Sequence, residues 1–335
     1  MQFSGYTTCR IGAAISCFVL APLVQAQTLG VDFASSYSVS SLGSVPSLPA
    51  NYGGLTFIGN DTLLIGGAAN GASGSLYTVG VTRNASNHIS GFTGTATRFG
   101  GALGEVGEYN DGGVVFGPGG VLFTARWPIN SLGQTKPGSI NEDKVIELGQ
   151  LGVASSLAAL NFVPVGFGGA GQIKMVSYGG GQWYSGSLSP DGSGTFNISG
   201  LAQVDLDGGV AGIQNVPGGP EGFVYIAAGN AGFSANSMLI SEYQAGVVGA
   251  YTVDSEGNPL VASRRTFLSG LTGAEGAAID PLTGDFLFST FGGSSQVVVV
   301  SGFAPPVVAI PEPETYVLML AGLGLLGTVA RRRRR

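Results

Sequence analysis

Few residues in this sequence could carry out acid–base, nucleophilic or zinc chemistry. The 335 residues include one histidine, His88, and two cysteines, Cys9 and Cys17. His88 lies in a polar segment, where a lone histidine is more often solvated than catalytic. No G-x-S-x-G elbow presents a serine nucleophile, and one histidine with two cysteines near the N-terminus does not make a zinc site. We therefore predict a protein that is not an enzyme, with no catalytic residue and no assigned metal site.

Carboxylates are the remaining chemical resource. Glu105, Glu108 and Asp111 are grouped shortly before an apolar segment. Glu221 and Glu275 stand at comparable positions before later apolar segments. Calcium prefers oxygen ligands of this kind, whereas acidic residues also cap turns and keep a weakly charged surface soluble. No cofactor is assigned on this basis. Calcium is the one candidate cation, and Glu108, Glu221 and Glu275 are the candidate ligand-binding acids.

Three acidic loops resemble calcium-binding loops only superficially. They begin at Asp191, Asp205 and Asp254, and each contains an acidic residue followed by glycine. None of them has the spacing of ligand positions that defines an EF-hand loop. We therefore assign no cation to these loops.

The two tryptophans, Trp127 and Trp183, are the aromatic candidates for ligand contact. Trp127 precedes a proline, and Trp183 follows three consecutive glycines. Aromatic side chains in glycine-rich loops can stack on sugar rings or anchor a protein partner. They also pack in the interior of proteins, which is the alternative at both positions.

The N-terminal segment has the organisation of a secretory signal peptide. Arg10 supplies the positive charge, Ile11–Leu23 is almost entirely apolar, and Val24 and Ala26 are small residues at −3 and −1 of a cleavage site. The apolar run is shorter than the roughly 20 residues of a membrane-spanning helix, which argues against an anchor. We expect signal peptidase to cleave after Ala26. Both cysteines then leave with the signal, so the mature protein has no disulfide.

The C-terminal segment has three parts in a fixed order. Residues Pro311, Glu312 and Pro313 begin it, and the apolar stretch Tyr316–Ala330 follows. The chain then ends in a basic cluster, Arg331, Arg332, Arg333, Arg334 and Arg335. Prolines keep a segment extended and accessible to an enzyme, and arginines after an apolar stretch stay cytoplasmic. These parts predict a processing site, a short transmembrane helix and a stop-transfer signal.

This tail resembles the PEP-CTERM sorting signal of Gram-negative exported proteins. The resemblance covers about 25 residues and implies recognition by an exosortase, with cleavage near the Pro-Glu-Pro motif. It also implies export, often in bacteria that make exopolysaccharide and biofilm. A plain tail anchor with a proline-rich stalk is the alternative.

Composition and charge exclude several other classes of protein. Hydrophobic residues make up 44% of the chain, which argues against intrinsic disorder, and the 59 glycines follow no collagen period. The formal net charge of −6 becomes about −10 once both processed ends are removed. Because binding to phosphates needs clustered Lys and Arg, nucleic acid is not an expected partner.

Short apolar strands and Gly/Pro/Asp turns recur along the central part of the chain. Units of this kind follow Gly54, Gly113, Gly209 and Gly276, and the wider middle interval predicts a divergent unit near Gly171–Tyr184. Only residues 153–160 look able to form a helix. Some strands are apolar on both faces, as expected for sheets packed between other sheets.

We predict an all-β fold, a β-propeller of five or six blades, with a β-sandwich or β-solenoid as the alternative. The unit resembles the blades of NHL-like and gluconolactonase-like propellers, without a diagnostic catalytic motif. The expected segments are listed by residue: signal peptide 1–26, propeller-like ectodomain 27–303, proline-rich linker 304–315, transmembrane segment 316–330 and cytoplasmic arginine cluster 331–335.

The functional prediction is an exported cell-surface or extracellular-matrix protein whose ectodomain is a non-catalytic interaction module. The alternative is a calcium-dependent, lactonase-like propeller enzyme. The expected partners are signal peptidase, an exosortase, the inner membrane before processing, and exopolysaccharide or other matrix components.

Overall fold

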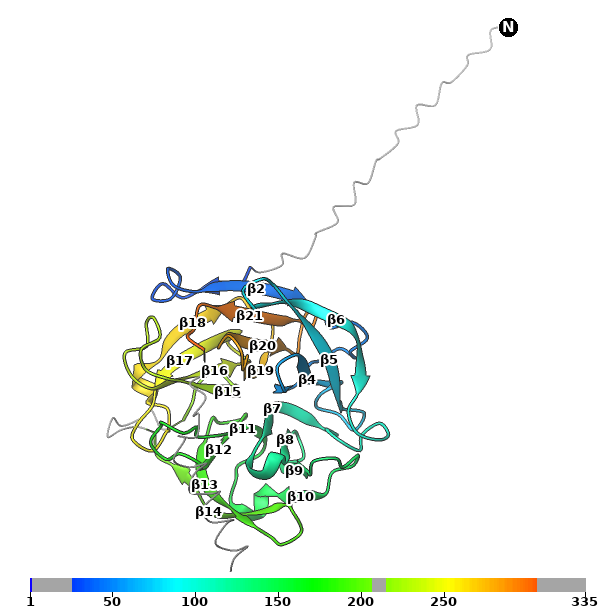
Figure 1. Cartoon of the computed structure of the whole chain (residues 1–335), viewed down its shortest axis with the longest axis vertical. Helices are drawn as coiled ribbons and strands as arrows, with labels where there is room; N and C mark the ends of the chain where they lie inside the picture. Colours follow the sequence, from blue (N-terminus) through cyan, green and yellow to red (C-terminus); the bar gives the residue numbers. More distant parts are fainter. Residues whose placement is uncertain (2–25, 207–214, 306–335) are drawn as a thin grey trace, which may run out of the picture.

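The structure is a closed five-bladed β-propeller, in agreement with the fold class predicted from the sequence (Figure 1). It is a computed structural model that describes Met1, residues 26–206 and residues 215–305. Each blade is an antiparallel sheet of at least four strands, and the innermost strands of the blades surround a common axis.

The strands of each blade follow one another in the chain from the axis outward, with the N-terminal strands β1 (Thr28–Leu29) and β2 (Ser38–Gly43) added at the rim. Blade 1 contains β3 (Leu55–Ile58), β4 (Thr62–Gly67), β5 (Ser75–Arg83) and β6 (Ile89–Arg98). Blade 2 contains β7 (Asn110–Phe116), β8 (Leu122–Arg126), β9 (Ser131–Thr135) and β10 (Lys144–Glu147). Blade 3 contains β11 (Leu157–Phe162), β12 (Ile173–Ser177), β13 (Trp183–Pro190) and β14 (Phe196–Val204). Blade 4 contains β15 (Pro220–Ile226), β16 (Ser237–Glu242), β17 (Val247–Thr252) and β18 (Arg265–Ser269). Blade 5 contains β19 (Ala274–Ile279), β20 (Phe286–Thr290) and β21 (Val297–Ser301), and short 3-10 turns lie at Pro118–Gly120, Leu148–Leu151 and Val261–Ser263.

The N-terminal strands close the ring without a covalent link. Strand β2 pairs antiparallel with β21 and forms the outermost strand of blade 5, so a strand from near the start of the chain lies beside the last strand of the propeller (Figure 1). Strand β1 pairs with β18 at the rim of blade 4. The pairing of β2 with β21 completes the fourth strand of blade 5 and ties the start of the propeller to its end, so that only short outer edges remain, as in other propellers.

Apolar side chains fill the spaces between neighbouring blades. Strand β21 shows how: Val298 and Val300 pack in one cluster with side chains of blade 4, and Val297 and Val299 pack in another with blade 1. Because successive side chains of a strand point to opposite faces, a strand covered on both sides must be apolar throughout. This packing between two neighbouring blades explains why some strands in the sequence are apolar on both faces.

Two details of the sequence interpretation are corrected by the structure. The second half of the helix-competent segment 153–160 belongs to β11 (Leu157–Phe162), because this strand pairs with β12 on the axis side of blade 3. Gly209 does not open a blade, since the innermost strand of blade 4 begins at Pro220. Gly209 itself lies outside the described residues.

The signal peptide and the sorting tail fall almost wholly outside the described residues, including Val24, Pro311 and the arginine cluster. Among the residues that the structure describes, none belongs to a helix of sufficient length and apolar character to span a bilayer.

Candidate functional site

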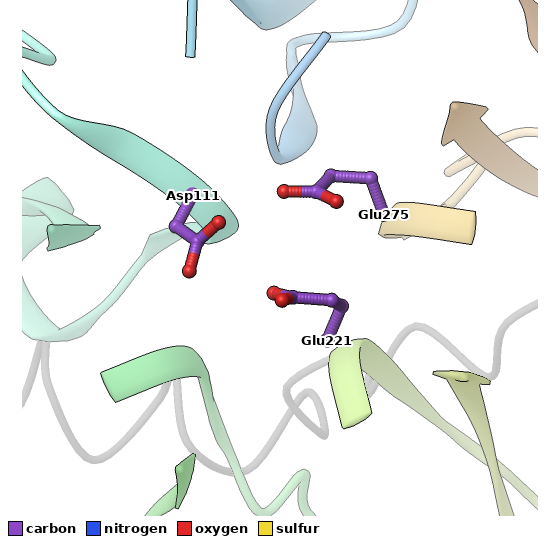
Figure 2. A group of neighbouring side chains, drawn as sticks. All are labelled: Asp111, Glu221 and Glu275. Carbon is purple, nitrogen blue, oxygen red and sulfur yellow. The ribbon is translucent and has the colours of Figure 1, made fainter. Parts of the chain in front are cut away.

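Three carboxylates meet on the propeller axis. Asp111, Glu221 and Glu275 are each the second residue of an innermost strand, in β7, β15 and β19 respectively. Their side chains point toward one another from three blades (Figure 2), and one carboxylate oxygen of each lies within 4.8 Å of the others. We call these three residues the axial cluster.

The backbone around each acid explains why it faces the axis. The pairing register of all three strands shifts at this point, between Asn110 and Val114 in β7 and at the matching places in β15 and β19. A β-bulge of this kind re-aims a side chain. Each acid is also followed by glycine; a Cβ on Gly222 would lie 2.7 Å from the Gly276 Cα of the next blade. The glycines therefore allow the strands to approach closely enough for the acids to meet.

The axial cluster is buried and has no cationic partner among the described residues. Asp111 and Glu275 are fully buried and Glu221 is 3% exposed. Oxygens of all three carboxylates lack a hydrogen-bond partner, including both oxygens of Glu275. The Asn70 amide, with its nitrogen facing the cluster, donates to Asp111 Oδ1 at 2.9 Å.

Burial and mutual repulsion disfavour the charged forms of these acids. Burial raises the pKa of the Asp111 carboxyl to about 7. The pKa of Glu221 is raised well above its ordinary value by burial and then by the charge of Asp111. The pKa of Glu275 is raised well above its ordinary value by burial and then by the charges of Glu221 and Asp111. The cluster thus holds up to three negative charges that the described residues do not neutralise.

A ring of aromatic side chains lies beside the axial cluster. The residue that directly follows the second strand is Trp127 in blade 2, Tyr178 in blade 3, Tyr243 in blade 4 and Phe291 in blade 5. Each of these residues donates its backbone N–H to the residue just before the innermost strand of its own blade, at 2.8–2.9 Å. The four positions are therefore structurally equivalent.

The rings contact one another edge to face in the order of the blades. The centroids of Trp127 and Tyr178 are 6.4 Å apart, those of Tyr178 and Tyr243 are 5.8 Å apart, and those of Tyr243 and Phe291 are 6.0 Å apart. Such geometry is favourable for aromatic pairs. Blade 1 places Ala68 at the equivalent position, so the ring is open on that side.

The aromatic ring encloses a cavity of about 360 Å³, which we call the aromatic cup. Its lining is completed by Asn51, Ala69, Asn70 and Glu221, so one acid of the axial cluster faces it. Burial and the charge of Glu275 raise the pKa of Tyr243, which keeps that hydroxyl protonated and able to donate a hydrogen bond. The cup therefore combines flat apolar surfaces with amide, hydroxyl and carboxylate groups.

The ligand-binding residues predicted from the sequence lie at different places in the structure, and not all of them reach the axial cluster or the aromatic cup. Glu221 and Glu275 lie in the axial cluster, but its third member is Asp111, while Glu108 is outside it and pairs with Arg126 at 2.6 Å. Trp127 lines the aromatic cup.

Trp183 lies elsewhere: it is fully buried between blades 3 and 4, and its Nε1 donates to Asn258 at 3.2 Å. This position agrees with the alternative interpretation of the tryptophans, in which the side chain packs in the protein interior. Asn70, Tyr178, Tyr243 and Phe291 were not singled out from the sequence. The feature that these four residues share, and that could have identified them, is their position directly after the second strand of a blade or in the loop that follows.

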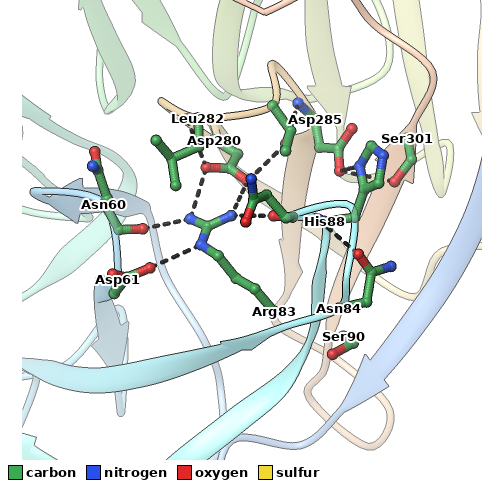
Figure 3. A network of polar contacts seen from close by, with 12 residues as sticks. Asn60, Asp61, Arg83, Asn84, His88, Ser90, Asp280, Leu282, Asp285 and Ser301 are labelled. Carbon is green, nitrogen blue, oxygen red and sulfur yellow. Dashed lines mark hydrogen bonds and ion pairs between the residues drawn. The ribbon is translucent and has the colours of Figure 1, made fainter.

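His88 belongs to a polar network that joins blade 1 to blade 5 (Figure 3). Its Nδ1 lies 2.6 Å from the buried carboxylate of Asp285, which also accepts a hydrogen bond from Ser301. Nearby, the Arg83 guanidinium contacts both oxygens of Asp280 at 2.7 and 2.9 Å, and Asp61 at 2.8 Å. Because His88 does not line the aromatic cup, its contacts indicate a role in blade packing.

The loops at Asp254 and Asp191 already engage their carboxylates in protein contacts. Asp254 accepts hydrogen bonds from the backbone of Glu256 and Asn258, both at 2.8 Å, and Asp191 accepts from the backbone of Ser193 at 2.9 Å. These are turn contacts of the Asx type. Asp191 also forms an ion pair at 2.8 Å with Lys144 of blade 2, which joins blades 2 and 3.

Solved structures that resemble the propeller share little sequence with it. Glutaminyl cyclase from Myxococcus xanthus is 15% identical with a TM-score of 0.44, over 78% of this chain and 95% of that one. The PQQ domain of pyranose dehydrogenase from Coprinopsis cinerea is 11% identical with a TM-score of 0.41, over 83% and 97%. A putative 6-phosphogluconolactonase from Bacteroides uniformis is 14% identical with a TM-score of 0.39, over 77% and 69%. Similarity at this level carries no argument about activity.

The C-terminal tail, in contrast, matches a family model. Residues 309–335 match the PEP-CTERM protein-sorting motif, which confirms the resemblance seen in the sequence. A comparison with curated protein sequences finds no match. The motif implies an exosortase partner and export through a membrane-anchored intermediate. The chain thus carries a PEP-CTERM sorting motif at residues 309–335, after a five-bladed β-propeller.

Proposed function

We propose that the propeller is a non-catalytic binding module of the cell surface or extracellular matrix, and that the aromatic cup binds carbohydrate. The observation that carries this proposal is the ring of four equivalent aromatic residues around a cavity of about 360 Å³. Exopolysaccharide is the proposed ligand class, because sugar rings present apolar faces for aromatic contact and hydroxyls for hydrogen bonds.

The polar groups of the cup support this assignment. Asn51 and Asn70 offer amide groups at the open side of the ring, where blade 1 has no aromatic residue. Tyr178 and Tyr243 add hydroxyls, which both donate and accept hydrogen bonds. A linear polysaccharide can therefore pass over the cup at blade 1 while one ring contacts the aromatic surfaces.

The proposal of a non-catalytic role rests on what surrounds the cup. Glu221 is the one acid that faces it, and it is 3% exposed. General acid–base catalysis needs a group within hydrogen-bond reach of the substrate, and nucleophilic catalysis needs an activated nucleophile. Apart from Glu221 and the tyrosines Tyr178 and Tyr243, the described cup lining offers no acid–base or nucleophilic side chain, since it contains neither a serine nor a histidine.

Ligand titration of the purified exported protein tests the proposal. Binding of oligosaccharides from the host's exopolysaccharide is followed by the change in Trp127 fluorescence, and by calorimetry for variants that lack this residue. Trp127→Ala and Tyr243→Ala should each weaken binding by about tenfold, the effect of one lost aromatic contact. Phe92→Ala is the matched control, because Phe92 is a half-exposed aromatic on the outermost strand of blade 1. Equal affinity of all four proteins would refute the cup as the binding site.

A calcium-dependent, lactonase-like activity is the second candidate, favoured by one observation. The axial cluster brings three carboxylates together, and Glu221 links it to the cup. An assay of lactone hydrolysis with added calcium tests this candidate. Turnover by the wild type that is lost in Glu221→Gln would replace the binding module with an enzyme.

A further inference from the structure

The axial cluster presents a charge problem that the described protein groups do not solve. Three carboxylates lie together in the interior, and none forms an ion pair with a described Lys or Arg. A buried charge is costly unless it is paired or coordinates a metal. Other buried acids of this chain follow the rule: Asp280 pairs with Arg83, and Glu242 pairs with Arg264. Asp285, also buried, contacts His88 and Ser301, whereas the axial cluster brings three acids together without a basic side chain among the described residues.

Glu275 adds a second, separate observation. Its side chain is fully buried, points at Asp111 and Glu221 (Figure 2), and receives no hydrogen bond at either oxygen from a residue outside the axial cluster. Most buried polar atoms in proteins have at least one partner. A carboxylate with two empty acceptor positions, aimed into a space shared with two others, has the arrangement of a metal ligand.

We propose that Asp111, Glu221 and Glu275 bind a calcium ion on the propeller axis. Two oxygens bound to one Ca²⁺ at about 2.4 Å are at most about 4.8 Å apart. One oxygen from each of the three residues lies within 4.8 Å of the others, which is compatible with this limit. Mg²⁺ retains several waters and is usually bound through one or two carboxylates, whereas Ca²⁺ accepts six to eight oxygen ligands in a flexible geometry. Three carboxylates that converge in a buried site therefore favour calcium.

The ion would join the innermost strands of blades 2, 4 and 5. Each ligand stands at a β-bulge next to a glycine that touches the neighbouring strand, so the strands are already in place. Glu221 also lines the aromatic cup, which gives the ion a route from solvent. Asn70 holds Asp111 by its hydrogen bond to Oδ1 and leaves Oδ2 without a partner. This role in holding blades together is separate from ligand binding in the cup.

Binding of terbium and calcium to the full exported protein tests the inference. After removal of bound metal by a chelator, Tb³⁺ is titrated and its luminescence is excited through the nearby Trp127 and Tyr243. Calcium is then measured by calorimetry. We expect one site per chain, displacement of Tb³⁺ by Ca²⁺, and at least about tenfold weaker binding in Glu221→Gln and Glu275→Gln, because affinity follows the number of charged ligands.

Asp254→Asn is the matched control. Asp254 lies in a loop that resembles a calcium loop, but its carboxylate already accepts backbone hydrogen bonds. This variant should bind calcium like the wild type. The inference is overturned if millimolar calcium gives no binding, or if both axial variants bind as tightly as the wild type. Loss of carbohydrate binding in the cup variants, with calcium binding intact, would leave this inference standing.

Discussion

Replacement of Glu275 by glutamine should stabilise the metal-free protein at pH 8. The substitution keeps the size of the side chain and removes one of the three acids of the axial cluster. The new side-chain amide would also place an N–H group beside the Asp111 carboxylate, one oxygen of which has no hydrogen-bond partner in the wild type. The expected sign is unusual, because most substitutions of fully buried residues destabilise a protein.

The magnitude follows from the cost of keeping Glu275 uncharged. Its ordinary pKa is 4.5, and burial and the neighbouring acids raise the pKa well above this value in the folded state. A buried polar group without a partner costs roughly 1–3 kcal/mol. The cost of keeping the Glu275 carboxyl uncharged rises with pH, because the same carboxyl ionises in the unfolded chain above its ordinary pKa. We therefore expect Glu275→Gln to gain roughly 1–3 kcal/mol at pH 8 and less at pH 5.

The sign of the pH dependence follows from proton linkage. A group whose folded-state pKa is raised binds more protons in the folded protein than in the unfolded chain, so its contribution to stability is lost as the pH rises. For Asp111 this loss falls between its ordinary pKa of 3.8 and about 7. The metal-free wild type should therefore become less stable from pH 4 to pH 8, and the variant should depend less on pH.

Thermal unfolding with a chelator, at pH 5 and at pH 8, measures both effects. A gain of roughly 1–3 kcal/mol corresponds to about 2–10 °C in Tm for a protein of this size. In millimolar calcium the order should reverse, because the wild type gains the binding energy of the ion and the variant lacks a ligand. A variant that is less stable than the wild type in chelator at pH 8 would refute the account of the axial cluster.

Three further predictions concern the blades and the tail. Gly222→Ala should lower the free energy of unfolding by about 1–3 kcal/mol, because its Cβ would meet backbone atoms of blade 5 at 2.6–2.8 Å. Gly91→Ala has open space around its Cβ and should leave the free energy of unfolding unchanged. Urea unfolding compares the two variants. Asp280→Asn should lower the free energy of unfolding by about 2–3 kcal/mol, because Arg83 loses its buried partner. Asp61→Asn changes an exposed carboxylate and should lower it by less than about 1 kcal/mol in the same assay. Changing Pro311, Glu312 and Pro313 to alanine should leave an unprocessed, membrane-held protein, whereas neutralising the five terminal arginines should misorient the tail. Fractionation and mass spectrometry separate these outcomes. Unchanged processing in a host without its exosortase would contradict the sorting assignment.

Much of the fold could be predicted from the sequence because blades repeat. Short apolar strands separated by Gly/Pro/Asp turns mark the blades, and strands that are apolar on both faces, such as Val297–Ser301, indicate sheets packed between sheets. The limits of a divergent blade could not be predicted so well. Blade 3 begins with Leu157–Phe162, whose composition suits a helix, and only pairing with its neighbour makes it a strand.

The axial cluster could be predicted in part. Glu221 and Glu275 were singled out by position, but Glu108 was preferred to Asp111, although all three members of the cluster directly precede a glycine. An acid directly followed by glycine is the sequence feature that marks the axial cluster. The glycine permits the close approach of neighbouring strands, and the bulge turns the acid toward the axis. The aromatic cup could not be predicted beyond Trp127. Tyr178, Tyr243 and Phe291 come together because strand ends in different blades meet, and strand ends are poorly defined in a sequence.

The most direct test of the proposed function is cosedimentation of the purified exported protein with exopolysaccharide isolated from its own host. The wild type and the double variant Trp127→Ala/Tyr243→Ala are compared, and reducing ends are counted before and after incubation. The account predicts that the wild type sediments with the polysaccharide, the double variant stays in solution, and the number of reducing ends does not change. Equal sedimentation of both proteins, no sedimentation of either, or an increase in reducing ends would contradict it.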